Sequence, residues 1–110
     1  MRRLDISGCM SLTDAAFVHL QGIHTLSMTG CTQATVTDRV FSYFKDIRVL
    51  SARNCPQFTD AALKYPLPNI RYLDITGCKK ITSHGLILVG ISGHATLKTV
   101  VDQDGKRINL

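Results

Sequence analysis

The chain has 110 residues, of which 45% are hydrophobic and 19% charged, and its formal net charge is +5. This balance predicts an ordered domain with its own core and excludes a disordered chain. No apolar run approaches the roughly 18 residues that cross a membrane, and the first residues lack the apolar segment of a secretory signal. We therefore expect one domain over residues 1–110 and a cytoplasmic, reducing location.

One short pattern, L-x-I-x-x-C with small variations, recurs along the chain. Its clearest copy is Leu73-Asp74-Ile75-Thr76-Gly77-Cys78. The cysteines that end the copies lie 22, 24 and 23 residues apart. Self-similarity at this period is typical of proteins built from stacked supersecondary units. The four copies occupy residues 4–9, 26–31, 50–55 and 73–78.

The first unit runs from Leu4 to about Ile23. It begins with alternating apolar and polar residues, the period of a half-buried strand. Gly8-Cys9 then turns the chain. Thr13-Asp14 follows as a helix-start signal, because the hydroxyl can accept from a free backbone N–H and the carboxylate suits the positive helix end. Apolar residues at helical spacing come next and predict a short helix.

The later units repeat this order. Strand patterns are expected at residues 23–28, 47–52 and 70–75. Helix starts are expected at Thr37-Asp38 and Thr59-Asp60, and a fourth helix after Ile81. Pro66 and Pro68 shorten the third helix, because proline removes a backbone donor and clashes with the preceding turn.

The last unit departs from the pattern. Asp104-Gly105 separates two strand-like runs, at Val100–Gln103 and Lys106–Leu110. Asp-Gly in this setting predicts a type I′ hairpin. We expect this hairpin to close the C-terminal edge of the sheet, since an open edge invites pairing with another chain. The layer under Leu4 has no such cover in the sequence, so a longer array or a second chain is expected there.

The repeated pattern I/L-x-x-L-x-I-x-x-C-x-x-L-T-D-x-x-L resembles the cysteine-containing leucine-rich repeats. These are best known from the substrate-binding halves of F-box ubiquitin-ligase receptors, and the resemblance covers residues 1 to about 100. It implies an α/β, right-handed solenoid with parallel strands on a concave face, helices on the convex face and a β-hairpin cap. No stretch resembles an F-box, so a role as a ligase adaptor rests on analogy alone.

The outward strand residues of such an array form one continuous surface, the usual binding face of solenoids. We therefore predict a non-catalytic module that binds a protein partner on the concave sheet. Tyrosine and arginine are the residue types that dominate interface energies. The candidate partner-binding residues are Arg3, Asp5, Ser27, Ser51, Arg53, Tyr72 and Asp74.

The four cysteines occupy one repeat position, so stacking places them in a row. A row does not enclose a tetrahedral metal, and we expect buried, reduced, structural thiols and no metal site. Thiol catalysis would also need a histidine in reach. The four histidines fall on the opposite edge, and the chain has no G-x-G-x-x-G or P-loop, so no enzyme and no cofactor is expected. The histidines are His19, His24, His84 and His94.

Two alternatives remain open. The chain is a self-associating structural solenoid fragment if its uncovered N-terminal layer pairs with another copy. Nucleic-acid binding, the less favoured reading, would need scattered basic residues to converge while Tyr72 stacks on a base. The acids Asp5 and Asp74 lie in the same field and would repel phosphate. The basic residues concerned are Arg2, Arg3, Arg53, Lys79 and Lys80.

Overall fold

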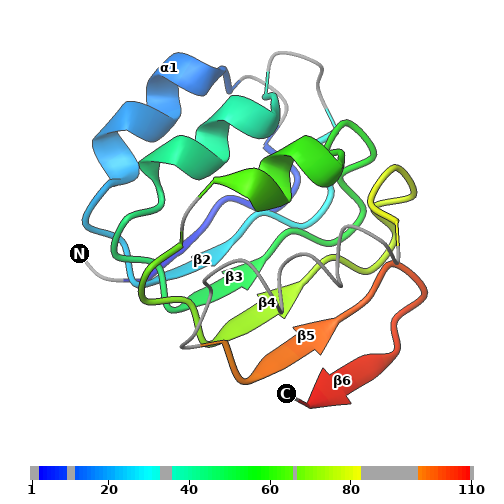
Figure 1. The fold of residues 1–110 in the computed structure, drawn as a ribbon. Helices are drawn as coiled ribbons and strands as arrows, with labels where there is room; N and C mark the ends of the chain where they lie inside the picture. The colour runs from blue at the N-terminus through cyan, green and yellow to red at the C-terminus, as the bar shows by residue number, and fades with distance from the viewer. Residues whose placement is uncertain (1–2, 10–11, 33–35, 66, 83–96, 110) are drawn as a thin grey trace.

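The computed structural model describes residues 3–9, 12–32, 36–65, 67–82 and 97–109 (Figure 1). Six strands lie side by side in chain order in one sheet. The first five pair in parallel, and the last is antiparallel to its neighbour. The expected α/β class with a mostly parallel sheet is thus confirmed. The strands are β1 (Arg3–Asp5), β2 (Thr25–Ser27), β3 (Val49–Ser51), β4 (Tyr72–Asp74), β5 (Thr99–Val101) and β6 (Arg107–Asn109).

The middle residue of each parallel strand sets the register. Leu4, Leu26, Leu50, Leu73 and Val100 are direct partners across the sheet. The last four are buried, while Leu4 at the edge is partly buried. Because side chains alternate between the two faces of a strand, the first and third residues of each strand point to the other face. A slip by one residue would expose this apolar row, so the register is strongly specified.

The turn after each of the first four strands has a left-handed backbone. Gly8, Gly30 and Gly77 have φ angles of 76°, 75° and 79°, and Asn54 takes the same place with φ 56°. Glycine adopts this conformation without steric cost, and asparagine tolerates it better than most residues. The Gly-Cys and Asn-Cys pairs of the sequence are therefore turns that end each strand, as expected.

The described residues form four short helical segments, the second continuing directly from the first, and these lie over one face of the sheet (Figure 1). Only the first segment is α-helical, and the other three are 3₁₀ helices. A 3₁₀ helix rises about 2.0 Å per residue against 1.5 Å for an α-helix, so a short segment carries the chain farther toward the next strand. The fourth expected helix falls within residues 83–96, outside the described residues. The segments are α1 (Asp14–Phe17), η1 (Val18–Leu20), η2 (Asp38–Tyr43) and η3 (Asp60–Lys64).

Aromatic rings from three units join the helical layer to the core. The Phe17 and Phe44 ring centroids lie 6.1 Å apart, and those of Phe41 and Phe44 lie 5.6 Å apart. Phe41 meets Phe58 edge to face at 5.1 Å. Edge-to-face pairs add to the stability that burial alone provides. These phenylalanines and the central strand residues belong to one hydrophobic cluster.

The aspartates at the helix starts link each unit to the next. The Asp14 carboxylate accepts from the backbone N–H of Thr37 at 2.8 Å and from its hydroxyl at 2.6 Å. Asp38 receives the same two bonds from Thr59, at 2.8 and 2.6 Å. Asp60 receives them from Thr82, at 2.8 and 2.7 Å. The sequence predicted these aspartates at the helix starts, but it did not predict their hydrogen bonds to the threonine of the next unit.

The threonine caps form in part. The Thr37 hydroxyl accepts from Arg39 N at 3.3 Å, and the Thr59 hydroxyl accepts from Ala61 N at 3.2 Å. Thr13 precedes α1 with an extended backbone and makes no side-chain cap bond there. The capping expected for the first unit is therefore wrong, while it holds for the second and third.

The C-terminal hairpin is present, but its turn differs from the expected type I′. Gly105 N donates to Asp102 O at 2.9 Å, and Gly105 has φ 81°. A type I′ turn needs positive φ at both central residues, and Gln103 and Asp104 have none. The loop instead has three residues with glycine in the left-handed position. The Asp102 carboxylate favours it by accepting from the N–H groups of Asp104 at 3.0 Å and Lys106 at 2.8 Å.

Replacing Asp38 by alanine is expected to lower the free energy of unfolding by about 2 kcal/mol, because both Thr59 donors lose a charged acceptor. Asp46→Ala is the matched control: Asp46 is exposed and should change stability by less than about 0.5 kcal/mol. Urea unfolding followed by circular dichroism measures both. Equal midpoints for the two variants would show that the contact between units contributes nothing.

Candidate functional site

The face of the sheet opposite the helices, which we call the strand face, carries three rows of side chains. Backbone hydrogen bonds extend the register beyond the strands: Gly8 N donates to Thr29 O, Gly30 N to Arg53 O and Asn54 N to Thr76 O. Each row therefore crosses the sheet with one residue per strand. The rows are Arg3, Thr25, Val49, Tyr72 and Thr99; Asp5, Ser27, Ser51, Asp74 and Val101; and Ser7, Thr29, Arg53, Thr76 and Gln103.

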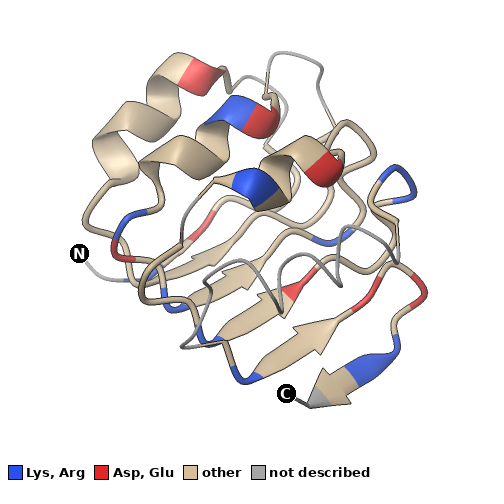
Figure 2. Ribbon diagram, viewed as in Figure 1, with Lys and Arg blue, Asp and Glu red and all other residues tan. Residues whose placement is uncertain are grey.

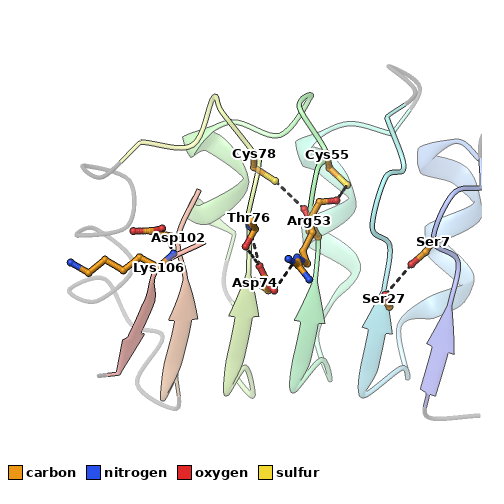
Figure 3. A network of polar contacts seen from close by, with 10 residues as sticks. Ser7, Ser27, Arg53, Cys55, Asp74, Thr76, Cys78, Asp102 and Lys106 are labelled. Atoms are coloured by element: carbon orange, nitrogen blue, oxygen red, sulfur yellow. Dashed lines mark hydrogen bonds and ion pairs between the residues drawn. The ribbon is translucent and has the colours of Figure 1, made fainter. Parts of the chain in front are cut away.

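A polar cluster centred on Asp74 lies near the middle of the strand face (Figure 3). Asp74 Oδ1 accepts from Thr76 N at 3.0 Å and from the Thr76 hydroxyl at 2.6 Å. Asp74 Oδ2 lies 3.5 Å from Arg53 Nε. The Asp74 side chain is only 9% exposed and that of Arg53 is 51% exposed. Asp74 thus holds the Nε edge of the Arg53 guanidinium group, while the exposed part of the arginine side chain stays accessible to a ligand.

Two further candidates adjoin this cluster. Ser51 is the direct partner of Asp74 on the neighbouring strand, and Tyr72 lies two residues before Asp74 on the same face. Both are half-buried. The structure therefore places Ser51, Arg53 and Tyr72 around Asp74. Asp74, predicted to be a partner contact, is buried and pairs with Arg53.

The other three candidates lie toward the β1 edge of the sheet. Arg3 and Asp5 are exposed, and Ser27 is half-buried between Asp5 and Ser51. The Ser27 and Ser7 hydroxyls are 3.0 Å apart (Figure 3). Bonds from the Ser7 side chain and backbone lower the pKa of Asp5. Arg3 is three strands from Tyr72, about 14 Å at the usual strand spacing, so the seven candidates form two groups.

The cysteines form a row in the core, as expected, with one exception. Cys31 Sγ donates to Ile6 O at 3.2 Å, Cys55 Sγ to Met28 O at 3.2 Å and Cys78 Sγ to Ala52 O at 2.9 Å. Each thiol thus bonds to the strand end of the preceding unit. Cys9 is exposed, because β1 is the edge strand. The expectation of four equivalent buried thiols is therefore wrong for Cys9.

Burial controls the acidity of these thiols. It raises the pKa of Cys55 to about 12, and it also raises the pKa of Cys31 and Cys78. Cys31, Cys55 and Cys78 are free thiols. Over the described ranges, no three His, Cys, Asp or Glu side chains gather closely enough to share a metal ion. Two of the histidines, His84 and His94, lie outside those ranges.

A fourth row at the starts of the strands was not predicted from the sequence. We call His24, Arg48, Arg71 and Lys98 the basic row. Arg48 N donates to His24 O at 2.8 Å, Arg71 N to Arg48 O at 2.8 Å and Lys98 N to Arg71 O at 2.9 Å. The signal was present, since each of these residues follows the apolar residue that opens its strand pattern: Ile23, Ile47, Ile70 or Leu97. The basic row becomes apparent only when the units are aligned, because its residues are far apart in the chain.

No protein-family model matches the sequence, and no curated protein matches it significantly. Among the residues that the structure describes, no helix combines the length and the apolar character needed to traverse a lipid bilayer.

Native protein treated with iodoacetamide near pH 8 should be alkylated at Cys9 alone, because the thiolate is the reactive form and Cys55 is protonated far above that pH. Cys31, Cys55 and Cys78 should react only in urea. Peptide mass spectrometry of both samples gives the sites. Reaction of native Cys55 at the rate of Cys9 would contradict its burial.

Proposed function

We propose that the chain is a non-catalytic protein-binding module whose partner docks on the strand face. The finer fold belongs to this proposal: the units form part of a right-handed solenoid of cysteine-containing leucine-rich repeats, with the strand face concave. The in-register rows, the thiol bonds and the aspartate bonds from unit to unit favour that arrangement. A ligase role follows from the resemblance alone, and no contact adds to it.

The observation that carries the proposal is the Arg53–Asp74 ion pair, with Tyr72 two residues before Asp74 on the same face. The buried Asp74 carboxylate pairs with the Arg53 guanidinium group and so limits the conformations of the Arg53 side chain before binding. Less conformational entropy is therefore lost when a partner binds. Tyr72 supplies apolar area with few rotatable bonds and a hydroxyl group. Ser51 lies beside Asp74 and Ser27 beside Ser51, and these small side chains let a partner backbone approach. Such a surface suits a protein ligand with a carboxylate and a neighbouring apolar side chain.

A photocrosslinking amino acid in place of Tyr72 should capture the partner, whereas the same amino acid at Lys64 should not. Lys64 is exposed and lies in η3 on the helical side. Excess wild-type protein should compete the crosslink away. Crosslinks that come only from position 64 would move the interface to the helical side and end the strand-face proposal.

For the partner so identified, Tyr72→Ala and Arg53→Gln should each weaken binding about tenfold, the size of a typical interface contact. Arg53→Gln is the cleaner change at its position, because a glutamate there would repel the buried Asp74 carboxylate. Isothermal titration calorimetry gives the affinities, and thermal unfolding verifies the fold. Full affinity in both variants would refute the assignment.

A second candidate function is self-association through the β1 edge. β1 ends the sheet, and Leu4, Ile6, Leu12 and Leu20 pack against the core without being fully buried. Exposed strand edges pair readily with other strands. An antiparallel pair of β1 strands centred on Leu4 would place Arg3 opposite Asp5 of the second copy. The edge is therefore complementary to itself in charge as well as in apolar surface.

Light scattering over a concentration series tests this candidate. Self-association predicts a mass that rises above the 12.1 kDa of one chain, and Leu4→Glu should hold the mass at that value. The substitution places a charge at the centre of the edge, where pairing would bury it. A constant mass of one chain for the wild type would exclude the β1-edge pairing.

A further inference from the structure

We propose that the basic row binds an extended acidic segment of a protein partner. The site lies where the parallel strands begin, outside the strand face, and Figure 2 shows blue segments gathered at the starts of neighbouring strands. The inference rests on the proposed function only in assuming that the ligand is a protein. It adds a second contact surface and specifies the charge of what binds there.

The spacing of the basic row is set by the backbone. The same carbonyl groups that accept from the row also accept from the next residue: His24 O from Val49 N at 3.0 Å, and Arg48 O from Tyr72 N at 3.1 Å. Each row member is therefore about 4.8 Å from the next, the distance between neighbouring strands. The backbone span from His24 to Lys98 is about 14 Å. This length suits a few residues of extended chain running across the strand starts.

Among the residues that the structure describes, no carboxylate forms an ion pair with the basic row. Arg48, Arg71 and Lys98 are exposed, and within the described ranges none of them forms an ion pair. Asp46, two residues before Arg48, forms no ion pair with it either. Like charges on directly neighbouring strands repel each other. A ligand with several carboxylates removes that repulsion and gains attraction at each position, so charge complementarity favours an acidic partner.

An acidic peptide fits the row better than a nucleic acid does. Single-stranded nucleic acids are held by aromatic side chains on which the bases stack, in addition to cations. The aromatic residue next to the row is Tyr72, and strand alternation directs it away from the side of Arg71. The described phenylalanines are buried in the core. Carboxylates on alternate residues of an extended peptide, about 7 Å apart, are within reach of flexible arginine and lysine side chains.

A fluorescein-labelled glutamate-rich peptide, followed by fluorescence anisotropy at low salt, tests the proposal. The wild-type protein should bind it, and added salt should weaken binding. R48E/R71E should lose at least about tenfold in affinity, because two attractive contacts become repulsive. K79E/K80E is the matched control, with the same change in net charge at exposed residues after β4, and it should lose less than about threefold.

Three results would overturn the proposal. One is the absence of peptide binding by the wild type at low salt. Another is an equal loss in the two double variants, which would reduce the effect to net charge. The third is tighter binding of a labelled single-stranded oligouridylate, weakened by R48E/R71E, which would make the row a nucleic-acid site. R48Q/R71Q serves if the charge reversal unfolds the protein, and it should melt no lower than the wild type while losing peptide affinity.

The proposals for the strand face and for the basic row can be refuted independently of each other. A partner crosslinked at position 72, together with no peptide binding, would leave the strand face as the interface and remove the basic row. Peptide binding that depends on Arg48 and Arg71, without a crosslink at position 72, would do the reverse. Arg53→Gln should leave the affinity for the acidic peptide unchanged, because Arg53 follows β3 and the basic row precedes the strands.

Discussion

The parallel register of the central leucines is the constraint on which the rest of the structure depends. Leu26, Leu50 and Leu73 are buried partners on successive strands. With one apolar residue fixed in the core, every other position of the unit also aligns with its counterpart in the next. Rows of equivalent side chains follow necessarily, because the strands are parallel and the side-chain period is two. The strand face and the basic row are both consequences of this single alignment.

Side-chain bonds between units hold the alignment away from the sheet. The Cys55 thiol bonds to the backbone of the unit before it, and the Asp38 carboxylate bonds to Thr59 of the unit after it. The thiol lies where the strand turns and the carboxylate where the helix begins. The two sets of bonds therefore fix both ends of the connection between strand and helix. Each set repeats along the chain, so the described units are bonded to one another at both places.

The same alignment separates charge along the strands. The basic row precedes the strands, while Asp5 and Asp74 lie at the ends of β1 and β4. An acid held by Arg53 and Thr76 is part of the structure, whereas unpaired arginines at strand starts cost free energy through repulsion. This contrast distinguishes charges that stabilise the domain from charges left available to a ligand. Because Arg48, Arg71 and Lys98 precede neighbouring strands, a chain with a modest net charge of +5 still presents a line of basic side chains on its surface.

The sequence by itself determined the strands, the turns, the thiol row and the outward face, because these depend on local patterns that recur at one period. It also placed the C-terminal hairpin. Only the tertiary structure decided that η2 and η3 are 3₁₀ helices, that Cys9 is exposed and that Asp74 is buried beside Arg53. Only the tertiary structure also places His24 and Lys98 in one row, linked by backbone hydrogen bonds through Arg48 and Arg71. These features depend on which residues of other units lie alongside, and a pattern read within one unit does not contain that information.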